Sequence, residues 1–144
     1  MSQASNTAMN SGQSVPDRPV PPSSALSAPY WEGVAAGRLL LQRCGACGVL
    51  RHYPRLLCTS CYSTAVTWQE SSRRGTINSW TVSHYAYHPS FAGDLPYTLV
   101  TVDLEEGPRA LGRWRGPAPA IGLRVMGNFE ARPGGFDLVF VPAS

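Results

Sequence analysis

Apolar and polar residues alternate in short runs over the second half of the chain, and turn-forming residues separate the runs. The clearest run is PYTLVTVDLEEG at residues 96–107, where Val100, Val102 and Leu104 share one face of an extended strand. Further strand-like runs lie at 65–71, 75–87, 109–116, 123–132 and 136–143, and the run at 75–87 is rich in Thr, Val, Ile and aromatic residues. Because no long helical pattern separates them, these runs predict a small antiparallel barrel in a mainly β protein.

The N-terminal segment has a different pattern. Residues 1–28 are rich in Ser, Pro, Asn and Gln and contain few apolar residues. Such a segment cannot bury enough apolar surface to offset the entropy lost when it becomes ordered. We therefore predict a disordered tail that becomes ordered only against a partner.

A short helix is predicted at residues 29–37, PYWEGVAAG, which begin with a proline and end with a glycine. Tyr30, Trp31 and Val34 fall at helical spacing and would form one apolar face. This face packs on its own domain or on a partner, and the sequence does not decide between the two. Residues 39–43 then have the pattern of a strand that leads into a cysteine-rich segment.

Composition and charge narrow the class of protein. Hydrophobic residues make up 43% of the chain and charged residues 15%, which is typical of a globular core and not of a fully disordered chain. The net charge of +3 gives weak support for nucleic acid as a partner. All 12 basic residues are arginine, which we attribute to genome composition rather than to selection for phosphate binding.

The sequence also predicts where the protein works. No run approaches the roughly 20 apolar residues that span a bilayer, so no membrane segment is expected. The N-terminus has neither a basic start nor an apolar stretch, so it is not a secretory signal. We expect a cytoplasmic protein, whose thiols stay reduced.

All 4 cysteines lie in CGACGVLRHYPRLLCTSC, residues 44–61, as two Cys-x-x-Cys pairs. Two such pairs supply the four thiolates of a tetrahedral structural zinc site. Disulfides fit poorly with a reducing compartment, and a thioredoxin-type pair is single and lies in a βαβ unit. Iron in a rubredoxin-like site uses the same ligands and is the main alternative. We predict one bound metal ion, Zn²⁺ rather than iron, with the ligands Cys44, Cys47, Cys58 and Cys61.

Residues 38–70 contain too few apolar residues for a core of their own, so a metal would supply the missing stability. Glycines at 45 and 48 favour a tight turn in the first Cys-x-x-Cys pair, whereas no glycine follows Cys61 in the second. Four thiolates around a divalent ion leave a local charge near −2. We expect the neighbouring basic side chains to offset this charge, namely Arg43, Arg51, His52 and Arg55.

If every cysteine binds the metal, no thiol is left as a nucleophile, and no phosphate-binding loop or serine elbow motif occurs. The remaining acid–base candidates are His84, His88, Asp94 and Asp103. The two histidines lie at the mouth of a predicted loop, residues 88–96, where we favour polar caps of a sheet edge over a catalytic pair. The chain thus has few groups with which to catalyse a reaction alone.

The motif GRWRG places Arg113 and Arg115 on one strand face and Trp114 on the other. The two arginines could bind a phosphate or diphosphate, or could equally form a solvated face with Trp114 in the core. Tyr85, Tyr87 and Phe91 could stack on a base, line an acyl channel, or belong to the barrel core.

The order of these elements resembles the family that joins a rubredoxin-like zinc ribbon to an OB-fold barrel and is associated with thiolase-like acyl-CoA enzymes. An aromatic helix leads through GRLLLQRC into CGACG, then YPR, CTSC, PYTLVTVDLEEG and a closing IGLRV. The resemblance covers about residues 29–142 and implies a zinc ribbon at 38–70 and an OB-fold barrel at 71–144. It also implies that the four cysteines are the metal ligands, while no catalytic residue carries over.

The resemblance implies a non-catalytic subunit that stabilises a thiolase, aldolase, acyltransferase or hydratase partner in a hetero-oligomer. The subunit would also help to shape the channel for the CoA thioester. For contacts with the CoA, the acyl group or the partner, we name Tyr30, Trp31, Phe91, Arg113 and Arg115. The alternatives are a single-stranded nucleic-acid binder, which the barrel, aromatics and arginines would suit, and an electron carrier with iron in the cysteine site.

Overall fold

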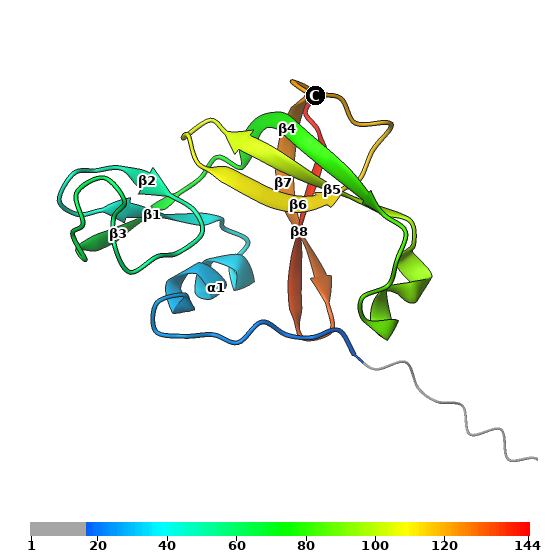
Figure 1. Cartoon of the computed structure of the whole chain (residues 1–144), viewed down its shortest axis with the longest axis horizontal. Helices are drawn as coiled ribbons and strands as arrows, with labels where there is room; N and C mark the ends of the chain where they lie inside the picture. The colour runs from blue at the N-terminus through cyan, green and yellow to red at the C-terminus, as the bar shows by residue number, and fades with distance from the viewer. Residues whose placement is uncertain (1–16) are drawn as a thin grey trace, which may run out of the picture.

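The computed structural model describes residues 17–144, which form a small sheet, a closed barrel and one α-helix between them (Figure 1). The mainly β class, with a short helix, a ribbon-like sheet and a closed barrel, is as the sequence predicts. Residues 1–16, where most of the disordered tail is predicted, lie outside the described part. None of the helices among residues 17–144 has the length and apolar character needed to cross a membrane.

Helix α1 (Ala28–Ala35) has Pro29 in its first turn, and Gly37 after its C-terminal end is in the left-handed region, with φ +74°. The N–H of Gly37 donates to the carbonyl of Val34 (3.0 Å), and the N–H of Arg38 donates to that of Gly33 (2.8 Å). These two bonds form a Schellman motif, which satisfies carbonyls at the helix end and reverses the chain. The helix is thereby directed back against the strand that follows it.

The ribbon is a three-stranded antiparallel sheet in the order β2-β1-β3. Strand β1 is central and delivers Cys44 at its end. The strands are β1 (Leu40–Cys44), β2 (Leu50–Arg51) and β3 (Val66–Glu70).

The barrel closes in the order β4-β5-β6-β8-β7, with antiparallel pairs except for the parallel pair of β6 and β8. This five-stranded closure is the pattern of an OB-fold. A 3₁₀ helix, η1, connects β4 to β5 at one end of the barrel (Figure 1). The elements are β4 (Arg74–Ser83), η1 (Pro89–Asp94), β5 (Tyr97–Leu104), β6 (Arg109–Trp114), β7 (Arg124–Arg132) and β8 (Gly135–Pro142).

One hydrophobic core joins the helix, the start of the ribbon and the barrel. Val100, Val102 and Leu104 are buried on the inner face of β5, as the alternation predicts. Leu39 and Leu41 at the start of the ribbon are fully buried in the same cluster. The ribbon is therefore attached to the barrel through apolar contacts and not only through the chain.

Two segments differ from the sequence pattern. The predicted strand at 75–87 ends at Ser83, and the predicted loop at 88–96 contains the 3₁₀ helix η1. His88 caps η1, because its ring nitrogen Nδ1 accepts a hydrogen bond from the backbone N–H of Ser90 (3.2 Å). The two tyrosines of 84–87 favour a strand, but the ladder with β5 ends at the pair of Ser83 and Tyr97, because Pro96 before Tyr97 has no N–H to donate.

Candidate functional site

Two similar turns hold the cysteines. In the first, the N–H of Gly48 donates to the carbonyl of Cys44 (3.0 Å); in the second, the N–H of Tyr62 donates to the carbonyl of Cys58 (2.9 Å). In each turn a backbone N–H also approaches the first sulfur: that of Cys47 lies 3.5 Å from Cys44 Sγ, and that of Ser60 lies 3.4 Å from Cys58 Sγ. The two turns face each other and direct their thiols to one point.

The four sulfur atoms lie within 4.8 Å of one another, and all four cysteines are free thiols. Cys44 Sγ lies 3.6 Å from Cys61 Sγ, and Cys47 Sγ lies 3.6 Å from Cys58 Sγ. A tetrahedron with metal–sulfur bonds of about 2.3 Å has sulfur–sulfur edges of about 3.8 Å. The thiols therefore fit a metal site, as the sequence predicts, and the zinc ion itself remains a proposal.

The thiols perturb one another electrostatically. The backbone N–H groups of Cys47 and Ala46 lower the pKa of the Cys44 thiol to about 6. For Cys61, the backbone N–H of Ser63 lowers the pKa, but the adjacent sulfur of Cys44 and burial outweigh it and raise the pKa to about 11. The first protons therefore leave the cluster easily, whereas the last ones are held. A bound cation would stabilise the fully deprotonated cluster.

The second turn obtains its shape without a glycine. Gly48 has φ +79° after the first cysteine pair, and Tyr62 has φ +62° at the matching place in the second. The glycine-poor second turn therefore adopts the same left-handed conformation as the first, but through a residue for which it is strained.

The ribbon beyond β1 has almost no core of its own. Between residues 44 and 70 the buried side chains are Cys44, Arg51 and Cys58. Two of these three are cysteines of the cluster, so the cysteine cluster occupies the place of a hydrophobic core.

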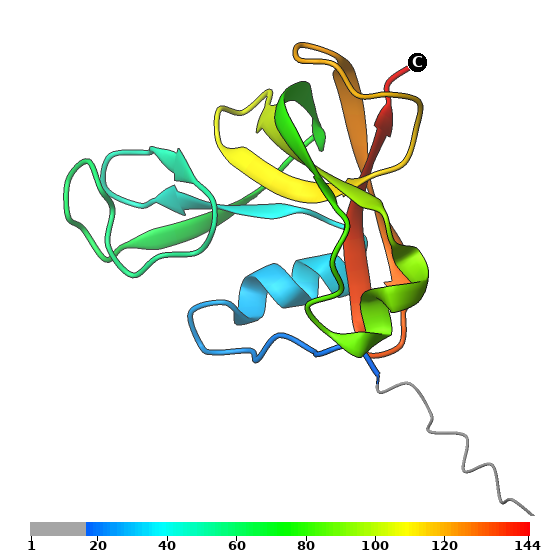
Figure 2. The ribbon, with the colours of Figure 1, turned by 45° about the vertical axis from the view of Figure 1, so that its right-hand side comes forward.

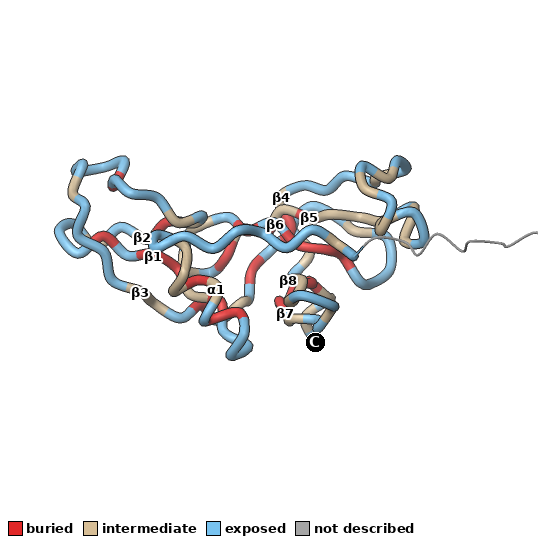
Figure 3. Tube along the Cα trace, turned by 90° about the horizontal axis from the view of Figure 1, so that it is seen from below, coloured by how far each residue is buried: buried red, intermediate tan, exposed pale blue. Residues whose placement is uncertain are grey.

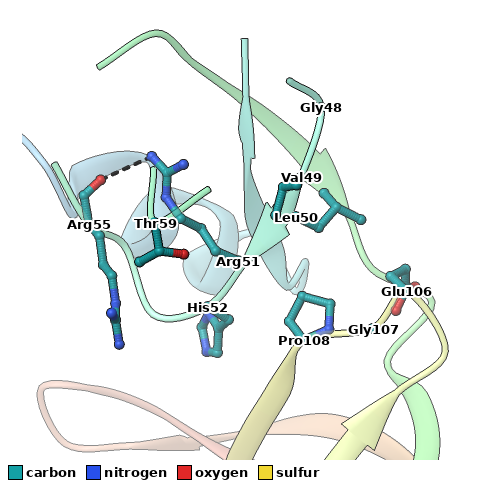
Figure 4. Close-up of a pocket in the computed structure, with 10 residues that line it drawn as sticks. All are labelled: Gly48, Val49, Leu50, Arg51, His52, Arg55, Thr59, Glu106, Gly107 and Pro108. Carbon is teal, nitrogen blue, oxygen red and sulfur yellow. Dashed lines mark hydrogen bonds between the residues drawn. The ribbon is translucent and has the colours of Figure 1, made fainter. Parts of the chain in front are cut away.

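Two of the basic residues predicted to offset the thiolate charge, Arg51 and His52, can be followed in the structure. Arg51 donates from Nε to Gln42 Oε1 (2.7 Å) and from NH2 to the carbonyl of Arg55 (3.1 Å), in the cleft between the ribbon and the turn at Glu106 (Figure 4). Burial lowers the pKa of His52 to about 4, so this ring is neutral at pH 7 and supplies no positive charge. For His52 the expectation is wrong.

A groove of about 350 Å³ between α1 and the barrel brings together four of the five residues predicted to contact CoA, acyl group or partner. Tyr30 and Trp31 line it from the helix, Phe91 from η1, and Arg113 from β6. In Figure 2 the helix lies beneath the barrel, with the N-terminal segment passing below it. Whether these side chains contact a ligand stays a prediction.

Arg113 is not on a solvated face. It is 8% exposed, its NH1 donates to Asp94 Oδ2 (3.0 Å), and its guanidinium lies 4.8 Å from the ring centroid of Tyr97. Partial burial acts to raise the pKa of Asp94, but the hydrogen bond from Arg113 and the charge of Arg18 outweigh it, so this pKa lies below its usual range.

Arg115 lies outside the groove. It follows the end of β6 and forms an ion pair with Glu130, with 3.1 Å between NH2 and Oε2. The two arginines of GRWRG therefore pair with different carboxylates, although both line a second pocket of about 380 Å³ next to the groove. Of the acid–base candidates, Asp94 pairs with Arg113, and Asp103 with Arg109 (2.7 Å).

One group at the groove has no signal in the sequence. Arg18 comes from the segment predicted to be disordered, but it forms ion pairs with Asp94 and Asp137 and lies 4.7 Å from the ring centroid of Phe91. Residues 17–24, here called the strap, run past α1 (Figure 1), and Pro21 of the strap lines the groove. No periodicity marks such a contact, because the strap has no regular secondary structure.

The two parts of this architecture each match a known protein family. Residues 31–67 match the family described as "ChsH2, rubredoxin-like zinc ribbon domain", and residues 68–130 match "ChsH2, C-terminal OB-fold domain". The chain belongs to the ChsH2 family. The ribbon-and-barrel resemblance drawn from the sequence is confirmed.

Solved structures agree with this membership. A ChsH2-family chain described as "Ltp2-ChsH2(DUF35) aldolase" is 35% identical with a TM-score of 0.76, and the alignment covers 86% of this chain and 99% of that one. A DUF35 protein of unknown function from Sulfolobus solfataricus has a TM-score of 0.60 over 84% of this chain and 87% of that one. At 12% identity the second likeness shows the fold alone.

Two curated relatives carry names of enzyme subunits. A "probable enoyl-CoA hydratase alpha subunit" from Thermomonospora curvata is 36% identical over 88% of this chain and 40% of the relative. A "3-oxo-4,17-pregnadiene-20-carboxyl-CoA hydratase alpha subunit" from Mycobacterium tuberculosis is 38% identical over 79% of this chain and 37% of the relative. The matched part is thus about 40% or less of the length of these relatives.

Proposed function

We propose that this ChsH2-family chain is a non-catalytic accessory subunit of an acyl-CoA-processing enzyme. It binds a thiolase-like, aldolase or hydratase partner in a hetero-oligomer, stabilises it and helps to shape the channel for the CoA thioester. The single observation that carries this proposal is the family membership, since the related chains are described as hydratase alpha subunits and as part of an aldolase. We place this assembly in the cytoplasm, where the cysteine thiols stay reduced.

The metal centre would supply rigidity and not chemistry. Four thiolates around Zn²⁺ close its coordination shell, which is the arrangement of structural zinc sites. Cys44, Cys47, Cys58 and Cys61 would hold the ion and thereby fix the two turns relative to β1. A rigid ribbon gives the partner a defined surface.

The groove supports a role at the acyl-CoA channel. Its lining combines apolar and aromatic side chains with Arg113, Arg132 and Asp137, and Asp137 pairs with Arg132 (2.7 Å). The apolar side chains and the arginines are the groups that would suit a thioester with an apolar chain and an anionic head. Arg113 is already held by Asp94, so an anionic ligand would compete with that carboxylate for the guanidinium.

The structure does not favour the nucleic-acid alternative. Several barrel arginines that could face phosphates are paired with carboxylates of the chain, among them Arg109, Arg113 and Arg115. Nucleic-acid binding would require a fall in affinity with rising salt that is linear on logarithmic axes. A titration with single-stranded oligonucleotides at low salt measures this directly.

The test is co-expression of the chain with the acyl-CoA enzyme subunits encoded beside it, followed by size-exclusion chromatography and elemental analysis. We expect one hetero-oligomeric peak with one zinc per copy of this chain. If the chain elutes alone beside every such subunit, the proposal is wrong.

A further inference from the structure

Strand β4 has a free edge over its second half. Its first part pairs with β7 through residues 74–76, and Ile77 bonds to the loop before β7 through Leu123 and Gly122. Beyond Ile77, the strand pairs with β5 as far as Ser83, but within residues 17–144 no backbone hydrogen bond reaches its other side. In Figure 1 this part of β4 extends away from β7 toward η1.

The register identifies which backbone groups are free. The N–H and carbonyl of Ile77 both point toward the loop before β7. The pair of Ile77 and Val102 is therefore a non-hydrogen-bonded pair of the β4–β5 ladder. A bulge inserts one residue between Ile77 and Ser79, and the alternation then resumes one step later. The backbone groups of Ser79 and Thr81 therefore face β5, and those of Trp80 and Val82 face outward.

The side chains at this edge are exposed and apolar. Trp80 is 41% exposed and Val82 is 43% exposed, and Tyr85 and Tyr87 beyond the strand are more exposed still. In the tube coloured by burial, the β4 region is largely exposed (Figure 3). Trp80 is paired with the fully buried Val100, so its side chain continues the core face of the barrel into solvent.

The edge also lacks the usual protection of a free strand. No Asp, Glu, Lys or Arg occurs from residue 75 to residue 93. Natural proteins protect exposed edges with charged residues, prolines or short strands, because an uncharged edge recruits other strands. Depletion of charge with enrichment of aromatic residues is also the composition of a protein interface core. These features are those of an edge that is covered in the working assembly.

We propose that the outer edge of β4, residues 78–83, pairs with an extended segment of the acyl-CoA enzyme subunit, which adds a strand to the barrel. The inference rests on the proposed function. The partner segment is uncharged and carries apolar side chains at alternate positions, because it lies opposite Trp80 and Val82 in a strip without charge. The descriptions of related chains as subunits favour this occupant over a second copy of the chain.

Hydrogen–deuterium exchange on the purified hetero-oligomer and on the free chain tests the pairing at single residues. In the free chain, the amides of Trp80 and Val82 should exchange fast, whereas those of Ser79 and Thr81 are protected by β5. In the complex, Trp80 and Val82 should slow by about 100-fold or more. A complex that forms without this slowing overturns the inference and leaves the proposed function standing.

Variants provide the second readout. Val82→Lys places a charge on the edge, and Val82→Pro removes the outward N–H while keeping the ladder to β5. Each should weaken the affinity for the partner subunit by about tenfold or more. Thr76→Lys is the matched control, because it adds the same charge to β4 where β7 already covers the edge, and its affinity should stay within about twofold.

The other possible results of these experiments would show that a different segment covers the outer edge of β4. A dimer of the free chain that Val82→Lys dissociates would assign the edge to a second copy and overturn the inference. Fast exchange at Trp80 that appears only after deletion of residues 1–16 would assign it to the chain's own N-terminus, with the same consequence. If no complex forms with any acyl-CoA enzyme subunit, the proposed function fails and this inference fails with it.

Discussion

At the scale of single residues, the most informative position near the cysteine cluster is Tyr62. Its φ of +62° puts a side chain where glycine would be unstrained, and the side chain is 76% exposed, so it gains little from packing. The second Cys-x-x-Cys pair therefore has the same turn geometry as the first, but at an energetic cost.

Tyr62→Gly should raise the free energy of unfolding of the zinc-bound chain by roughly 0.5–1 kcal/mol, since relief of the left-handed strain exceeds the added entropy of the unfolded glycine. Denaturant unfolding measures this. Tyr85→Gly is the control, because Tyr85 is exposed but is not among the residues with positive φ. Equal destabilisation by both variants would contradict the strain at Tyr62.

His52 is the second position with a residue-scale consequence. Burial lowers its pKa to about 4, it packs on the rings of Tyr30 and Tyr53, and within residues 17–144 neither ring nitrogen has a hydrogen-bond partner. In the unfolded chain, a histidine has a pKa of about 6.5. Between this pH and about pH 4, His52 is protonated in the unfolded state but not in the folded state, which favours unfolding.

Stability from His52 is thus present above pH 6.5 and is lost as the pH falls from about 6.5 to about 4, a change of roughly 3 kcal/mol. His52→Phe keeps an aromatic ring without the proton site. The variant should lose less stability than the wild type over this range, and should be at least as stable at pH 7. Both proteins contain the same cysteines, so the titration of the cysteines affects both equally. If stability falls with pH by the same amount in the two proteins, His52 is not buried in its neutral form.

At the scale of elements, the approach of β6 to β8 depends on Gly112. A Cβ there would lie 2.7 Å from two ring carbons of Phe140 and 2.9 Å from the carbonyl of Leu138. Phe140 is fully buried in the core, so its ring has no free direction in which to move. The same glycine lines the groove beside Arg113.

Gly112→Ala should lower the free energy of unfolding by roughly 1–3 kcal/mol, because the added methyl group overpacks the core. Gly93→Ala in η1 is the control, since a Cβ there would have no heavy atom of residues 17–144 within 4 Å beyond its chain neighbours. Thermal unfolding of both variants checks the contrast. A Gly112→Ala variant as stable as the wild type would show that β6 and β8 are less closely packed than the structure has them.

The sequence predicted elements whose pattern is local and periodic. The alternation in β5 and the cysteine spacing each place side chains by backbone geometry alone, and both predictions agree with the structure. The position of Arg18 at Asp94 and Asp137 could not be predicted, because it depends on a strap without secondary structure meeting residues more than 70 positions away. The early end of β4 depends on where its partner β5 begins, at Tyr97 after Pro96, which strand propensity does not include.

At the scale of the whole molecule, the ribbon and the barrel differ in what stabilises them. The barrel holds most of the buried apolar residues, whereas the ribbon from residue 44 onward buries two cysteines and Arg51. The two parts should therefore respond differently to loss of the metal.

Removal of the metal with a chelator should unfold the ribbon and leave the barrel folded. Amides of residues 44–63 should lose their protection from exchange, because thiolate–metal bonding supplies on the order of 10 kcal/mol to such a site. Amides of Val100 and Val102 in β5 should stay protected. Uniform loss of protection across both parts would contradict the separate stability of the barrel, and no change in either would contradict the metal site.

The measurement that tests the central claim most directly is thioester turnover by the co-expressed acyl-CoA enzyme subunit, with and without this chain. We predict that the chain alone turns over no thioester, and that the zinc-loaded chain raises turnover by the partner when the two form a complex. Turnover by the isolated chain, or a partner whose activity and stability are the same in its presence and absence, would contradict the account.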